Sequence, residues 1–194
     1  MKLRGLYAIT PEGAGLIDKL TQALEGGVAV LQYRRKKEKS LSEAKDVVAL
    51  ARRYHVPVII NDDIDLALAS GAAGAHLGRD DGDLAGARRE LEGKILGASC
   101  YDDPALAEAA VRAGADYVAF GSVFPSPTKP QAVRAPLGVF KKAYGVPLAA
   151  IGGITLQNAP QAIAAGAQML AVLSDLFEAP DIRSRALQYR KLFE

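Results

Sequence analysis

The sequence predicts an α/β protein, a compact (β/α)₈ TIM barrel with short loops. Short apolar, β-branched runs alternate with longer alanine-rich stretches of helical period along the whole chain. Eight such pairs in 194 residues give a repeating unit of about 24 residues. Residues 1–194 are therefore expected to form one barrel domain. The alternative is an open doubly wound sheet, which eight strands without a glycine-rich dinucleotide fingerprint disfavour.

The expected elements follow one another in strict alternation. Strands are predicted at Leu6–Thr10, Val28–Tyr33, Val58–Asn61, Gly74–Leu77, Ile95–Ser99, Tyr117–Phe120, Leu148–Ile151 and Met169–Leu173. Helices are predicted at residues 14–25, 41–54, 63–70, 84–91, 104–113, 137–144, 156–165 and 181–192. Ser40 followed three residues later by Glu43 forms a candidate capping box, and Gly71 supplies a helix end.

The composition is that of a globular chain without general affinity for nucleic acid. Hydrophobic residues make up 49% and charged residues 24%, which argues against wholesale disorder. Lys and Arg number 24 and Asp and Glu 22, so a net charge of +2 draws the chain to neither nucleic acid nor an acidic membrane. The lone Cys100 excludes an internal disulfide, and no signal peptide or membrane span is evident. We expect a cytoplasmic protein.

The carboxyl ends of the predicted strands are polar, whereas their opposite ends are mostly Gly, Ala, Val and Pro. Catalytic groups of such barrels come from these carboxyl ends and the loops that follow them. After the second strand, Gln32, Arg34 and Lys36 share one face at the two-residue period of a strand. An amide followed by two cations suits a ligand that joins a hydrogen-bonding ring to phosphate. A solvated basic loop is the alternative.

Two carboxylates form the second group. Asp62 and Asp81 each follow a strand closely and are expected to face one another across the barrel mouth, where two carboxylates suit Mg²⁺ that also binds substrate phosphate. Helix capping is the alternative. Their neighbours Asp63, Asp65 and Asp83 stand where helices begin and are expected to act as caps or dipole partners.

The last strands are followed by candidate phosphate-binding segments. The loop after the sixth strand, residues 121–130, is too long for a connector and carries hydroxyls and a lysine, although a surface turn is the alternative. Gly152-Gly153 and Ser174 are typical of the phosphate site of these barrels. His55 and Cys100 are interpreted as structural residues, and His76 as a packed, hydrogen-bonded barrel residue, with a catalytic role as the alternative for His76.

The order and spacing of seven motifs resemble those of the thiamine-phosphate synthase family, and the resemblance spans nearly the whole chain. The motifs are Gln32-x-Arg34-x-Lys36, Asn61-Asp62, His76-Leu77-Gly78-x-x-Asp81, Gly97-Ala98-Ser99, Gly121-Ser122-Val123-Phe124-Pro125-x-x-Thr128-Lys129, Ile151-Gly152-Gly153-Ile154 and Val172-Leu173-Ser174. The resemblance implies a (β/α)₈ transferase of thiamine biosynthesis that joins 4-amino-2-methyl-5-hydroxymethylpyrimidine diphosphate to a thiazole phosphate. The resemblance also implies that the reaction is a dissociative substitution that is assisted by Mg²⁺ and releases pyrophosphate.

The resemblance also implies residue roles. Gln32 is expected to bind the aminopyrimidine, and Ser99 to lie near the reacting methylene and the leaving group. The diphosphate is assigned to Arg34, Lys36, Asn61 and Lys129, and Mg²⁺ to Asp62 and Asp81. The thiazole phosphate is assigned to Ser126, Thr128, Gly153, Leu173 and Ser174. The partners are small molecules, and a homodimer is compatible with these features.

Three positions depart from the family pattern. Arg35 stands where Glu is often found, Arg79 where Gln is common, and Tyr101 where His often follows the serine. Two alternatives stay open. A thiazole-phosphate tautomerase shares the scaffold but usually lacks the metal aspartates and carries a histidine where this chain has Ser122. A non-catalytic paralogue that binds phosphate ligands is the other alternative.

Overall fold

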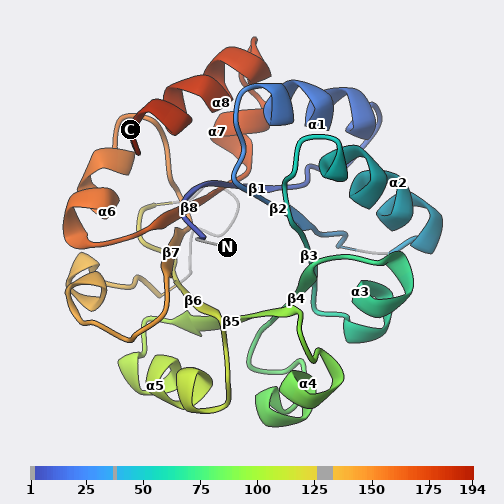
Figure 1. Cartoon of the computed structure of the whole chain (residues 1–194). Helices are drawn as coiled ribbons and strands as arrows, with labels where there is room; N and C mark the ends of the chain where they lie inside the picture. The colour runs from blue at the N-terminus through green and yellow to red at the C-terminus, as the bar shows by residue number, and fades with distance from the viewer. Residues whose placement is uncertain (1–2, 37–38, 126–132) are drawn as a thin grey trace.

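The computed structural model describes residues 3–36, 39–125 and 133–194, which form a closed barrel of eight parallel strands surrounded by helices (Figure 1). The strands pair in chain order, and β8 pairs with β1 to close the sheet. They are β1 (Gly5–Ile9), β2 (Val30–Tyr33), β3 (Val58–Asn61), β4 (Gly74–Leu77), β5 (Ile95–Tyr101), β6 (Tyr117–Phe120), β7 (Leu148–Ile151) and β8 (Met169–Val172). The predicted fold class is confirmed.

The helices lie outside the strand ring, as Figure 1 shows in a view along the barrel. They are α1 (Leu16–Glu25), α2 (Leu41–Arg52), α3 (Ile64–Ser70), α4 (Leu84–Glu90), α5 (Pro104–Arg112), the 3₁₀ helix η1 (Leu137–Lys141), α6 (Ala159–Ala165), α7 (Ser174–Phe177) and α8 (Ile182–Lys191). Within the described ranges, none of these is long and apolar enough to cross a membrane.

Two of the predicted helical assignments differ from the structure. The helix expected at residues 137–144 is the short 3₁₀ helix η1 (Leu137–Lys141), whose second residue, Gly138, has a low helix propensity. The four-residue helix α7 was not predicted, because so short a segment carries no helical period. Gly71 ends α3 in the left-handed conformation, as expected.

The strands separate two apolar cores. Alternate residues face opposite sides, so that Leu6 and Ala8 pack outward against the helices while Tyr7 and Ile9 pack inside the barrel. The inner core consists of Leu3, Tyr7, Ile9, Val30, Ile59, Tyr117, Ala119, Ala149, Met169 and Ala171. The barrel interior is therefore a packed core rather than a pore.

Two tyrosine rings occupy much of this interior. Tyr7 and Tyr117 are almost fully buried and meet edge to face, with ring centroids 5.8 Å apart. Space for Tyr117 comes from Gly97 on the neighbouring strand β5, where a Cβ would lie 2.1 Å from the Tyr117 Cζ. The glycine of the predicted Gly97-Ala98-Ser99 motif is thus required by the size of the ring beside it.

We predict that Gly97→Ala lowers the free energy of unfolding by about 2 kcal/mol or more, because the added methyl group overlaps the Tyr117 ring. Urea unfolding measures the loss. Gly138→Ala is the control, since a Cβ at that position meets no atom within 4 Å. Equal stability of the two variants would contradict the packing argument.

Candidate active site

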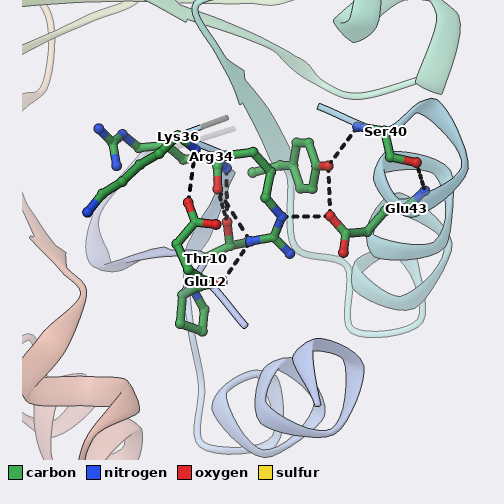
Figure 2. Close-up of polar contacts among 9 residues, drawn as sticks. Thr10, Glu12, Arg34, Lys36, Ser40 and Glu43 are labelled. Atoms are coloured by element: carbon green, nitrogen blue, oxygen red, sulfur yellow. Dashed lines mark hydrogen bonds and ion pairs between the residues drawn. The ribbon is translucent and has the colours of Figure 1, made fainter. Parts of the chain in front are cut away.

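The carboxyl end of β2 presents two cations on one side. The side chains of Arg34 and Lys36 both extend away from Glu43 (Figure 2). Their backbone is held to the β1 loop: the Arg34 N–H donates to Thr10 Oγ1 and the Thr10 hydroxyl donates to the Arg34 carbonyl, both at 2.9 Å, while the Lys36 N–H donates to Glu12 Oε1 at 2.9 Å. The predicted alternation of Arg34 and Lys36 is therefore observed at an anchored strand end.

The intervening Arg35 takes the opposite direction. Its Nε donates to Glu43 Oε1 at 2.7 Å and its Nη1 to the Pro11 carbonyl at 2.7 Å. Tyr33 also donates to Glu43 Oε1, at 2.8 Å. The hydrogen bond to Glu43 raises the pKa of Arg35, and the same bond lowers the pKa of Glu43. Arg35 thus ties the β2 end to α2 instead of joining the other two cations.

The candidate capping box at Ser40 forms only in part. Ser40 Oγ accepts from the Glu43 N–H at 3.3 Å and begins α2 as predicted. The reciprocal bond is replaced, because the Glu43 carboxylate binds Arg35 and Tyr33 and the Ser40 N–H donates to the Tyr33 hydroxyl at 3.2 Å (Figure 2). The glutamate that the motif assigns to the helix cap therefore supports the basic strand end.

Asp62 and Asp81 come together at the mouth, as expected. Partial burial of Asp62, together with its hydrogen bond to the Asp81 carboxyl and the charge of Asp81, raises the pKa of Asp62 to about 6. Asp62 adopts a left-handed backbone with φ 55°, and its N–H donates to the His76 carbonyl at 2.9 Å. Asn61 donates to the Asp62 carboxylate, and the Gly78 N–H donates to Asp81 Oδ2 at 2.7 Å.

The neighbouring carboxylates serve the helices. Asp63 caps α3 by accepting from the Leu66 N–H, and Asp83 caps α4 by accepting from two backbone N–H groups. Asp65 lies inside the first turn of α3 and is not the cap. The capping alternative therefore describes Asp63 and Asp83, not Asp62.

A divalent cation fits the Asp62–Asp81 pair. The two carboxyl groups are in contact despite their like charge, an arrangement that a cation between them relieves. The part of the chain that the structure describes holds no group of three or more His, Cys, Asp or Glu able to bind a metal. Two carboxylates leave room for water and phosphate oxygens, which is the coordination typical of Mg²⁺.

A buried hydrogen-bond chain links Gln32 to Ser99 through the barrel interior. Gln32 Nε2 donates to the Tyr7 hydroxyl at 2.8 Å, and the Tyr7 and Tyr117 hydroxyls are 2.7 Å apart. The Tyr117 hydroxyl lies 2.9 Å from His76 Nδ1, and His76 Nε2 lies 2.8 Å from Ser99 Oγ. Burial lowers the pKa of His76 to about 4, so the predicted packed, hydrogen-bonded role of this residue is confirmed.

An irregularity in β5 sets the direction of Ser99. The register with β6 shifts between Ser99 and Tyr101, so that Cys100 is an extra residue in the strand. Cys100 packs in the outer core, where burial raises the pKa of its thiol to about 12. This confirms the prediction that Cys100 is a structural residue. Ser99 stays on the inner side, within reach of His76.

Phe124 and Pro125, which follow β6, pack against Gly153 after β7 without room for a Cβ at the glycine. An added Cβ at Gly153, which has φ 65°, would lie 2.3 Å from the Pro125 carbonyl oxygen. Gly153 itself accepts a bond from Asn158 Nδ2 at 2.8 Å. The predicted residues Ser126, Thr128 and Lys129 lie outside the described residues.

The last two predicted residues stand where β8 passes into α7. Leu173 precedes α7 and is half-buried against the inner core, and Ser174 is the first residue of the helix. Asp175, the next residue, receives the Tyr189 hydroxyl at 2.7 Å and an ion pair with Arg185 at 2.7 Å. These contacts with α8 fix the start of α7 beside the mouth.

The other two departures from the family pattern contact each other. The Arg79 guanidinium lies over the Tyr101 ring, 4.8 Å from its centroid, and the Arg79 N–H donates to the Tyr101 hydroxyl at 3.2 Å. Tyr101 also lies close to Gly78, beside Asp81. The two changes therefore form one cation–π pair at the rim near the carboxylates.

Sequence reasoning missed three residues of this region: Tyr7, Tyr117 and Thr10. The signal for the tyrosines was present, because a Tyr on the inner face of a predicted barrel strand needs a polar partner for its hydroxyl. Thr10 carried no such signal, since its bonds to Arg34 depend on the pairing of β1 with β2.

Comparisons with known proteins identify the family of this chain. The sequence model of a family described as "Thiamine monophosphate synthase" matches residues 6–176. A protein of Aromatoleum aromaticum named "Thiamine-phosphate synthase" is 55% identical, covering 100% of this chain and 98% of its own length. A protein of Methylobacillus flagellatus with the same name is 50% identical over 98% of this chain and 96% of its own length.

Solved structures extend the similarity to the fold. A thiamine phosphate pyrophosphorylase from Pyrococcus furiosus superposes with a TM-score of 0.88 at 30% identity, covering 99% of this chain and 96% of that one. A 3-hexulose-6-phosphate synthase superposes with a TM-score of 0.81 over 98% of this chain and 100% of that one, but at 19% identity. The second likeness concerns the barrel alone.

We predict that Asp62→Asn raises the melting temperature of the metal-free protein above about pH 6. Because folding raises the pKa of Asp62 from 3.8 to about 6, the stability it contributes is complete below about pH 4 and is lost as the pH rises through about 6. Asn carries no charge and tolerates the left-handed backbone, so the gain grows over this window and then levels off.

Thermal scans of both proteins in chelator between about pH 4 and pH 8 test this. Asp46→Asn, at an exposed position on α2, is the charge-matched control and should give no such gain. A gain independent of pH contradicts the assignment of Asp62 as the strained carboxyl.

Proposed function

The chain belongs to the thiamine monophosphate synthase family, and we propose that the mouth of its barrel joins an aminopyrimidine diphosphate to a thiazole phosphate with release of pyrophosphate. The observation that carries this proposal is the convergence of two carboxylates with an anchored pair of cations at one rim. A diphosphate bound with a divalent cation needs both kinds of charge, positive groups for its oxygens and carboxylates for the metal.

The cations stabilise the leaving group. Arg34 and Lys36 carry no ion pair among the described residues, so their charge is available to phosphate oxygens. Asn61, beside Asp62, is assigned to the same diphosphate, and Lys129 is a further predicted ligand. When the carbon–oxygen bond breaks, negative charge grows on the pyrophosphate, and prepositioned cations lower the barrier without reorganising.

Asp62 and Asp81 are the proposed ligands of Mg²⁺. A bound Mg²⁺ would neutralise charge on the departing pyrophosphate. The carboxylates hold the ion next to the rim, and their mutual repulsion in its absence is consistent with the raised pKa of Asp62.

The organic parts of the substrates have separate proposed contacts. Gln32 binds the aminopyrimidine edge through its amide, and Ser99 lies near the reacting methylene. Pyrophosphate leaves first, and the thiazole nitrogen then attacks the pyrimidine carbocation, so no general base is needed. This agrees with a site whose one histidine has a pKa near 4 and is buried in hydrogen bonds.

The thiazole phosphate is assigned to the part of the rim that follows β7 and β8. Gly153, Leu173 and Ser174 are proposed to bind its phosphate through backbone and hydroxyl donors, with Ser126 and Thr128 contributing from the β6 loop. The Asp175–Arg185–Tyr189 contacts support this region by fixing α7. We further propose a cytoplasmic location; a homodimer stays a prediction.

Incubation of the protein with both substrates and Mg²⁺ tests the activity, with thiamine phosphate and pyrophosphate as the measured products. We expect turnover that chelation abolishes and Mg²⁺ restores. Isomerisation of the thiazole phosphate without the pyrimidine diphosphate would instead identify a tautomerase. Ligand binding without any turnover would identify a non-catalytic paralogue.

We predict that Asp62→Ala lowers kcat by about 100-fold or more, because the metal loses one of two protein ligands. Asp63→Ala is the matched control at the next position: it removes the α3 cap, costs about 1 kcal/mol of stability and leaves kcat nearly unchanged. Steady-state kinetics with a parallel unfolding curve separate the two effects. Equal losses of activity in both variants would contradict the metal assignment.

A further inference from the structure

The hydrogen-bond chain inside the barrel has a direction. Gln32 turns its Nε2 toward the Tyr7 hydroxyl at 2.8 Å, and an amide nitrogen can only donate. Tyr7 accepts from Gln32, and among the described residues the Tyr117 hydroxyl, 2.7 Å away, is the other contact of this buried hydroxyl, so the Tyr7 proton finds an acceptor only there. The end of the chain at Gln32 thus determines which way the first hydroxyl points.

The same reasoning continues to the other end. Tyr117 accepts from Tyr7, so its proton goes to His76 Nδ1 at 2.9 Å. His76 then carries its proton on Nε2 and donates to Ser99 Oγ at 2.8 Å. Each of the four bonds receives one proton, and a second proton on the ring would leave one phenol without an acceptor. Ser99 accepts from the histidine, so its own O–H is directed away from the chain toward the mouth.

We propose that Gln32, Tyr7, Tyr117, His76 and Ser99 form a polarised relay in which the amide orientation of Gln32 fixes Ser99 as a hydrogen-bond donor to the leaving group. Tyr7, Tyr117 and His76 are its positioning residues. The role of Ser99 rests on the function proposed above, whereas the direction of the relay does not. The relay deepens that function by coupling recognition of the pyrimidine to the orientation of a group at the reacting end.

The direction agrees with the chemistry of the ligand. An anionic diphosphate needs donors, and a serine whose proton pointed to His76 would offer it only lone pairs. In the proposed arrangement Gln32 keeps its Oε1 and one N–H for the ring edge, while Ser99 keeps its proton for an oxygen anion. A ligand that reversed Gln32 would also turn the Ser99 proton inward, and the barrier to leaving-group departure would rise.

The interior is built to hold this chain rigidly. Tyr117 packs edge to face on Tyr7 and stacks on His76 with ring centroids 5.5 Å apart. The five residues come from β2, β1, β6, β4 and β5, so the relay crosses the barrel rather than following one strand. Burial raises the pKa of both tyrosines, which keeps both phenol protons in place.

The histidine tautomer tests the direction without substrate. The chain has two histidines, so a long-range ¹H–¹⁵N spectrum of ligand-free protein at about pH 7.5 resolves both, and His55→Gln assigns them. We expect His76 to be protonated on Nε2 and bare on Nδ1. Protonation on Nδ1 would overturn the proposal, whatever the enzymatic activity.

Transmission across the barrel is tested by Gln32→Leu, which removes the amide donor that sets the direction at this end. We expect the ¹⁵N chemical shifts of the two His76 ring nitrogens to move toward the values of a mixture of tautomers, although His76 does not touch Gln32. Tyr144→Phe is the control, because the buried Tyr144 hydroxyl has no hydrogen-bond partner in the described part of the chain. An unchanged His76 spectrum in Gln32→Leu refutes a relay.

Kinetics test whether the relay acts through Ser99. We expect Tyr117→Phe to lower kcat by about tenfold while KM for the thiazole phosphate stays within about twofold, and Tyr144→Phe to leave both unchanged. In a Ser99→Ala background, Tyr117→Phe should cause no further loss of kcat. Losses that multiply in the double variant would show a purely structural role and reject the proposal. If Tyr117→Phe fails to fold, the His76 ¹H–¹⁵N spectra of the unmutated protein and of Gln32→Leu decide whether the relay exists.

Discussion

The pairing of β8 with β1 closes the sheet, and the geometry of the interior and of the rim follows from that closure. Only a closed parallel sheet satisfies the backbone groups of all eight strands and gives them a common interior. Closure also brings every carboxyl end to the same rim. Residues as distant in sequence as Gln32 and Ser99, or Asp62 and Asp81, become neighbours of one site for this reason.

A barrel interior is ordinarily filled with branched aliphatic side chains, and this one contains two phenols and an imidazole. Buried polar groups are costly unless they are paired, so the chain from Gln32 to Ser99 must stay complete. The space for it is reserved by the absence of a side chain at Gly97. Packing and site geometry are consequently decided by the same few residues.

The rim keeps its charges in separate groups. Arg35 neutralises Glu43 and draws it away from the mouth, while Asp63 and Asp83 are used by helix ends. This leaves Arg34 and Lys36 at the end of β2 and the Asp62–Asp81 pair at the ends of the next two strands, β3 and β4. The contact between the two carboxyl groups is only partly relieved by Asn61, Gly78 and Lys39, so it lowers stability where both are ionised and is consistent with a site for a cation.

Local patterns in the chain were enough to predict the fold class, the eight strands to within a few residues, and the meeting of Asp62 with Asp81, because strand and helix periods and turn glycines are local properties. The family followed from seven ordered motifs and is confirmed by the comparisons. Three features became known only from the folded chain. Glu43 binds Arg35 and Tyr33 instead of completing a helix cap, and residues 137–141 form a 3₁₀ helix. Inside the barrel, two tyrosines and His76 connect Gln32 to Ser99. These contacts join separate strands and helices, and local periodicity carries no information about which side chains meet once the barrel has closed.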